Sequence, residues 1–166
     1  IKRRMLAVTL ASEYCISLLA NQLLISREVL DGIEINYVNL WLWHAVEEIE
    51  HKSVAYDVYL SVGGCYSERV AVLIAVTAIY AFMTIRNYLF FLKKDKLLLN
   101  LKAWSFLLKV SFFKPGFFRQ VIPKYFKFFR MDFHPWDEDN LYLIEKWKSE
   151  YPDIDKTKDK PRTLYT

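Results

Sequence analysis

The sequence predicts an all-α protein, and its composition and length support that class. The 166 residues include only 4 glycines and 5 prolines, too few for the many turns of a sandwich or barrel. A hydrophobic share of 54%, with 17% aromatic residues, suffices for a core and excludes intrinsic disorder. The length suits a single domain, which we expect over residues 1–150, followed by a solvated tail over residues 151–166.

The first half of the chain predicts three helices. An apolar run over residues 5–26, in which Glu13 is the only charged side chain, indicates a buried helix. A second helical pattern runs from about residue 36 to residue 62 and stops at Gly63 and Gly64. A third helix follows Ser67, and its uncharged stretch over residues 70–85 would be about 24 Å long. This is short of a hydrocarbon core of about 30 Å, so we expect a central core helix rather than a membrane span.

The second half predicts shorter helices. A fourth helix from about residue 96 to residue 113 should end at Pro115, with short helices after it and a last helix over residues 137–150. His134 precedes a proline, which favours an extended backbone, so we expect a packed turn there rather than a metal ligand. Cys15 and Cys65 lack metal-binding spacing, and we expect buried thiols without a disulfide framework.

Charge is distributed unevenly along the chain, although the formal net charge is only +4. Residues 31–68 carry seven acids and one base, whereas residues 86–130 carry eleven bases and one acid. The bases alternate with aromatic residues, and no recognition-helix, zinc-finger or RNP-type pattern occurs, so we expect no nucleic-acid partner. The segment 104–130 instead fits either an ordinary core covered by lysine stems or a peripheral contact with a membrane.

The segment 41–57 contains the most informative motif. On one helix, His44, Glu48 and His51 share a face, and Glu47 lies near its edge. Glu48 and His51 form a Glu-x-x-His pair, which offers a carboxylate and an imidazole to one metal centre. The alternative is an amphipathic helix whose acids face solvent. Apolar residues spread around this helix and leave no wide polar stripe, so the pattern favours a metal site.

Glu13 supports the same interpretation, because a lone carboxylate in an apolar helix is costly to bury unless it is paired, protonated or bound to a cation. The alternatives are a salt bridge to an arginine or a raised pKa. A single Glu with a Glu-x-x-His pair is half the ligand set of a ferritin-like dimetal bundle. We therefore expect Glu13, Glu48 and His51 to bind a divalent transition metal, with iron or manganese favoured over zinc. His44 and Glu47 would be a supplementary ligand or supports that orient the ligands.

These segments resemble a known family. Ala11-Ser-Glu13-Tyr, the block Trp43-His44-Ala-Val-Glu47-Glu48-Ile-Glu50-His51-Lys52 and Phe133-His134-Pro135-Trp136 are similar to the carboxy-terminal half of the bacterial predicted metal-dependent hydrolases. The resemblance implies a partial ferritin-like helical bundle with extra carboxy-terminal helices. It also implies an amino-terminal half that carries a further Glu and a Gln-Glu-x-x-His motif, neither of which occurs here. We therefore expect a missing amino-terminal segment, or a homodimer partner, to complete the site.

Three functions follow from these observations. The first is a metal-dependent hydrolase with a carboxylate and histidine dimetal site acting on an apolar substrate, and the second is a di-iron oxygenase with the same ligands. The third, from a different class, is a non-catalytic helical protein of the membrane surface. The sequence contains no Gly-rich phosphate loop, no Gly-x-Ser-x-Gly elbow and no HExxH motif. We expect a cytoplasmic protein, with membrane association as the alternative.

Overall fold

The structure, a computed structural model, describes residues 2–113 and 116–152. Its regular elements in that part of the chain are helices, which confirms the all-α class. The predicted tail lies outside the described residues except for 151 and 152. The elements are α1 (Lys2–Ile25), η1 (Arg27–Leu30), α2 (Ile35–His51), α3 (Val54–Ser61), α4 (Tyr66–Lys94), α5 (Leu101–Leu108), η2 (Lys109–Phe113), α6 (Phe117–Lys127), η3 (Pro135–Asp137) and α7 (Leu141–Glu150).

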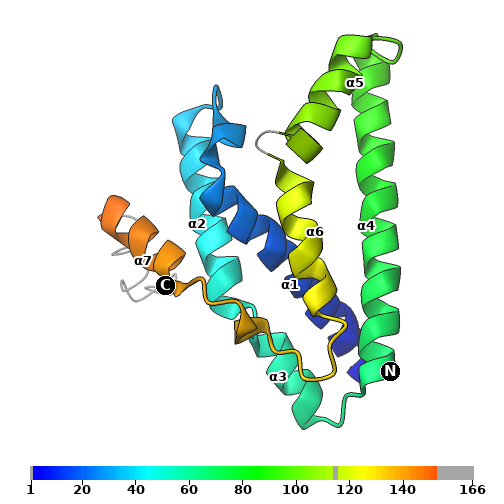
Figure 1. The fold of residues 1–166 in the computed structure, drawn as a ribbon, viewed down its shortest axis with the longest axis vertical. Coiled ribbons are helices and arrows are strands. Elements are labelled where there is room, and N and C mark those ends of the chain that lie inside the picture. Colours follow the sequence, from blue (N-terminus) through cyan, green and yellow to red (C-terminus); the bar gives the residue numbers. More distant parts are fainter. Residues whose placement is uncertain (1, 114–115, 153–166) are drawn as a thin grey trace, which may run out of the picture.

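Helix α1 lies at the centre and contacts α2, α3, α4, α6 and α7 (Figure 1). One buried cluster joins the first part of α1 to α3, α4 and α6 through side chains such as Leu10, Tyr59, Leu73 and Val121. A second cluster joins the end of α1 to α2 and α7 through side chains such as Ile49 and Trp147. The apolar residues of the predicted 5–26 segment thus form the core of both clusters, although one face of α1 stays exposed at Met5 and Val8.

The predicted helix over residues 36–62 is in fact two helices, α2 and α3, separated at Lys52 and Ser53. Lys52 is 4% exposed, and its ammonium donates to the Glu138 carbonyl oxygen at 2.6 Å and to Asn140 Oδ1 at 2.7 Å. It also lies 3.9 Å from the centre of the Trp136 ring. Burial lowers the pKa of Lys52 to about 8. These long-range contacts hold the break between the helices, and no local sequence signal marks them.

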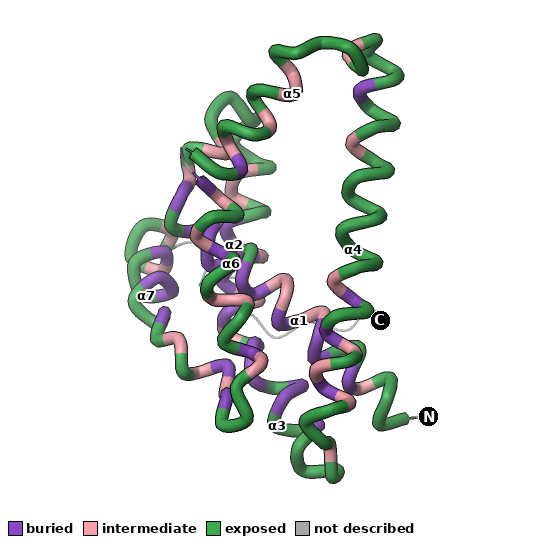
Figure 2. The backbone as a smooth tube through the Cα atoms, turned by 45° about the vertical axis from the view of Figure 1, so that its right-hand side comes forward, coloured by how far each residue is buried: buried purple, intermediate pink, exposed green. Residues whose placement is uncertain are grey.

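The prediction of a central core helix over residues 70–85 is wrong. Leu73 and Val76 pack against α1, but no residue from Thr77 to Phe91 is buried (Figure 2). Among the described helices, α1 and α4 are long and apolar enough to cross a membrane, yet in α4 only 17% of that apolar stretch is buried, against 50% in α1. The apolar sequence therefore determines a long helix whose second half, in the part of the chain that the structure describes, has few buried contacts: Leu92 is buried and Tyr88 packs against Trp104 of α5.

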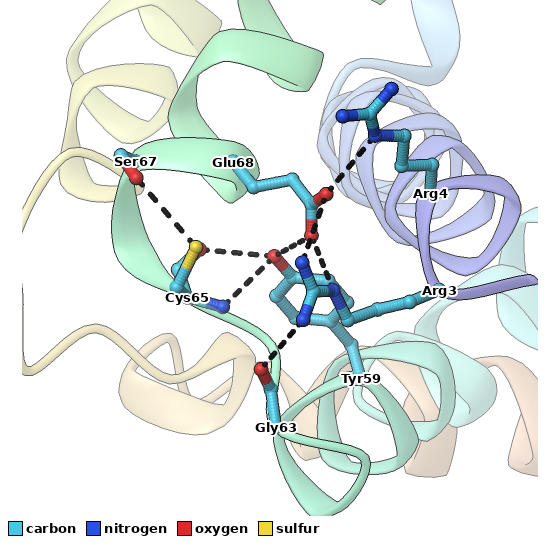
Figure 3. Close-up of polar contacts among 7 residues, drawn as sticks. All are labelled: Arg3, Arg4, Tyr59, Gly63, Cys65, Ser67 and Glu68. Atoms are coloured by element: carbon cyan, nitrogen blue, oxygen red, sulfur yellow. Dashed lines mark hydrogen bonds and ion pairs between the residues drawn. The ribbon is translucent and has the colours of Figure 1, made fainter. Parts of the chain in front are cut away.

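A polar network ties the start of α1 to the start of α4 (Figure 3). Arg3 Nε donates to Glu68 Oε2 at 2.9 Å, and the Tyr59 hydroxyl lies 3.0 Å from the same oxygen. The backbone N–H of Cys65 donates to the Tyr59 hydroxyl at 3.1 Å. The network fixes the Tyr59 ring between two helices.

Both cysteines are free, but Cys65 is exposed, so the expectation of a buried thiol is wrong for Cys65.

Gly64→Ala is expected to lower the free energy of unfolding by about 1–3 kcal/mol, the usual cost of overpacking. A Cβ at Gly64 would overlap the ring of Tyr59, which is fully buried and held by its hydroxyl contacts. Urea denaturation followed by circular dichroism measures the change. The same substitution in a Tyr59→Leu background should cost less, and an equal cost in both backgrounds would contradict this explanation.

Candidate metal site

The candidate site begins with Glu13, near the middle of α1. Its side chain is half-buried, and its Oε2 atom is buried without a hydrogen-bond partner. Burial raises the pKa of Glu13, and a hydrogen bond from the backbone of Ala55 partly opposes that rise. Within the described residues Glu13 forms no salt bridge with an arginine, so one of the two alternatives to a metal site is absent. The other, a raised pKa, is present.

The tertiary structure brings Glu48 and His51 of α2 close to Glu13. The negative charge of Glu48 further raises the pKa of Glu13, and His51 lowers it, so all three side chains are near enough to interact electrostatically. Glu48 is 20% exposed, whereas His51, the last residue of α2, is exposed. The packing of α1 against α2 thus places two carboxylates and an imidazole in one region.

The other two predicted residues lie on the same helix. His44 Nε2 is 3.4 Å from Glu48 Oε1, one turn away, and the His44 ring meets Trp41 edge to face. Glu47 is half-buried, as a residue near the edge of this face should be. Glu50 points elsewhere, since its carboxylate lies 3.0 Å from Lys148 Nζ of α7. His44 can therefore orient Glu48 directly.

The residue types at this site suit a divalent cation, but their side chains do not converge on a common point. In residues 2–113 and 116–152 no group of three or more His, Cys, Asp or Glu side chains is placed to hold a metal ion. The unpartnered Oε2 of Glu13 is nevertheless a buried acceptor for which the protein supplies no donor. Two carboxylates with one imidazole are a usual ligand set for iron, manganese or zinc. A cation would satisfy that oxygen and offset the repulsion between Glu13 and Glu48.

His134 lies in a packed turn, as predicted. Its Nδ1 accepts a hydrogen bond from the Trp136 backbone at 3.2 Å, and its Nε2 lies 3.0 Å from Asp57 Oδ1. The Asp137 carboxylate accepts from the His134 backbone N–H, which completes a capping box around η3. This histidine joins α3 to the segment before α7.

One contact to the site was not predicted from the sequence. The backbone of Ala55, at the start of α3, lies close enough to the Glu13 carboxylate to lower its pKa. A backbone donor cannot be predicted from the pattern of side chains in a sequence. The break between α2 and α3 is the feature that makes such a donor available, because the first N–H groups of a helix lack partners within it.

The family model described as predicted metal-dependent hydrolase matches residues 1–139, which include all five predicted site residues. Searches of curated protein sequences and of solved structures give no significant match.

Proposed function

Because the chain belongs to the family of predicted metal-dependent hydrolases, we propose that Glu13, Glu48 and His51 are the residues by which it holds a catalytic divalent metal. The observation that supports this most directly is the buried Oε2 atom of Glu13, which has no hydrogen-bond partner. A second carboxylate, that of Glu48, lies near enough to raise the pKa of Glu13 further. An uncompensated buried acceptor costs about 1–3 kcal/mol, and a metal ion would remove that cost.

Iron or manganese is the favoured metal. Two carboxylates and one imidazole form a carboxylate-rich ligand set. Carboxylate oxygens suit harder ions such as iron and manganese, whereas thiolates suit softer ions. A ferritin-like dimetal centre needs two single carboxylates and two Glu-x-x-His pairs, and this chain supplies one of each. The second set would come from a further segment of the protein or from a second copy of this chain.

Hydrolysis is the reaction that the family description indicates. When bound, such a metal supplies a nucleophile by lowering the pKa of a coordinated water molecule. The chain's own contribution is to hold the ligands in place. His44 orients Glu48 from one turn away, and the Ala55 backbone stabilises the charged form of the Glu13 carboxylate. The apolar residues next to Glu13 on α1, among them Leu10 and Tyr14, favour an apolar substrate.

Metal binding by the purified chain tests this proposal. We expect the unmodified protein to bind Mn²⁺ in a titration followed by calorimetry, and Glu13→Gln, Glu48→Gln and His51→Ala each to weaken binding at least about tenfold. Each substitution removes a donor atom while its neighbours remain. Glu50→Gln is the matched control, because Glu50 lies on the same helix but pairs with Lys148.

The effect of the control variant and the number of metal ions per chain decide whether the proposed ligand set is correct. If Glu50→Gln weakens binding as much as Glu13→Gln, the metal is bound by general negative charge and the proposed ligand set is wrong. Light scattering on the same samples separates the two ways of completing the site. A dimer with one dimetal centre per pair supports the two-fold arrangement, and weak binding by a chain that does not form a defined dimer supports a further segment.

A further inference from the structure

We propose that the turn joining α4 to α5, residues 93–102, docks onto a lipid bilayer that contains anionic lipids. This turn lies at the end of the molecule opposite the N-terminus (Figure 1). It is separate from the metal site, and the proposal is independent of the proposed function. The observations that support it are the exposed leucines of the turn, the lysines around them and the exposed apolar surface of the helices that carry it.

The turn presents apolar side chains to solvent in a defined conformation. Leu99 is 96% exposed and Leu101 is 82% exposed, in a segment where Leu98 is also exposed. The indole Nε1 of Trp104 donates to the Leu98 carbonyl oxygen at 2.9 Å, and the Asn100 side chain accepts from the Lys102 backbone at 2.9 Å and caps α5. The backbone is thus held by its own contacts, while the side chains of Leu99 and Leu101 are largely exposed to solvent.

The charges around the leucines are almost all positive. Lys93, Lys94, Lys96 and Lys102 are exposed, and Asp95 is the only acid in residues 86–130. Apolar side chains that enter the acyl chains below a ring of lysines at headgroup level are the pattern by which peripheral proteins bind anionic membranes. The same ring would repel a second copy of this turn, so charge complementarity selects an anionic surface over self-association.

The helices behind the turn extend this surface without crossing a bilayer. The first part of α4 packs against α1 through Leu73 and Val76. The remaining part, residues 78–94, is about 25 Å long, less than a hydrocarbon core of about 30 Å, and it contains Arg86. Exposed aromatic side chains continue into α5 and η2, at Phe106 and Phe113. These features favour a helix pair lying at the interface over a membrane span.

Vesicle sedimentation tests the proposal on the unmodified chain. We expect binding to vesicles of phosphatidylcholine mixed with phosphatidylglycerol, little binding to phosphatidylcholine alone, and release in molar salt. The double variant Leu99→Glu and Leu101→Glu should bind at least about tenfold more weakly. The control is Met131→Glu, because Met131 is as exposed as Leu101, at 82%, but lies after α6.

Several results would overturn the proposal. These are equal binding to both kinds of vesicle, equal loss in the Met131→Glu control, and protein that stays in the membrane after washes with salt and alkali, which would indicate that α4 inserts. A dimer in light scattering that is dissolved by the leucine substitutions would show that a second copy covers the turn instead. Circular dichroism of each variant confirms that a loss of binding is not a loss of fold.

Discussion

Replacing Arg69 by methionine is expected to lower the free energy of unfolding by about 2–5 kcal/mol. Arg69 is 3% exposed in α4, and its guanidinium donates to the Tyr56 hydroxyl at 2.6 Å. It also donates to the carbonyl oxygens of Phe128 at 3.2 Å and Arg130 at 2.6 Å. Methionine fills much of the volume but leaves these acceptors without their donor. The unfolding free energy from urea denaturation checks the expected loss.

The aromatic surroundings of Arg69 explain why its effect should be large. The guanidinium carbon lies 5.0–5.7 Å from the ring centres of Tyr56, Tyr66, Phe128 and Phe133, within the range of cation–π attraction. This one side chain therefore joins α3, α4 and the segment after α6. Arg130→Met is the matched control, because Arg130 forms an exposed ion pair with Asp132 and its loss should cost less than about 1 kcal/mol. Equal losses in the two variants would contradict the proposed role of the buried network.

Trp147→Ala is expected to lower the free energy of unfolding by about 3–5 kcal/mol, the usual cost of deleting a fully buried aromatic side chain. Trp147 is 0% exposed and packs, with Leu143 and Ile144, against Val46 and Ile49 of α2. Its removal leaves a cavity between α7 and α2. Urea denaturation measures the loss, and Tyr142→Ala, on the exposed face of α7, is the control and should change little.

This prediction also concerns the proposed metal site. Trp147 touches the buried face of the helix whose other face carries His44, Glu48 and His51. The family model matches residues 1–139 and so leaves α7 outside. If α7 supports the position of α2, Trp147→Ala should also weaken Mn²⁺ binding by the chain, measured at a temperature where the variant is folded. Unchanged binding would show that α2 keeps its place through α1 alone.

The candidate site shows which of its features the sequence pattern predicts and which it does not. The Glu-x-x-His spacing placed Glu48 and His51 on one face of α2 because helical periodicity is local, and the structure keeps that arrangement. The lone acid in an apolar helix likewise indicated a partly buried Glu13. That Glu48, His51 and the Ala55 backbone lie near enough to Glu13 to shift its pKa depends on how α1 packs against α2 and on where α2 ends. Both are long-range properties.

The sequence by itself determined the all-α class, the first helix and the choice of candidate ligands, because each depends on composition and periodicity within a short stretch of chain. Only the tertiary structure decided where the buried surface lies. It placed Lys52 and Arg69 inside, broke the second predicted helix, and left most residues of α4 exposed. Burial is a relation between distant segments, and an apolar stretch has the same sequence whether its partner is another helix, a second protein or a lipid surface.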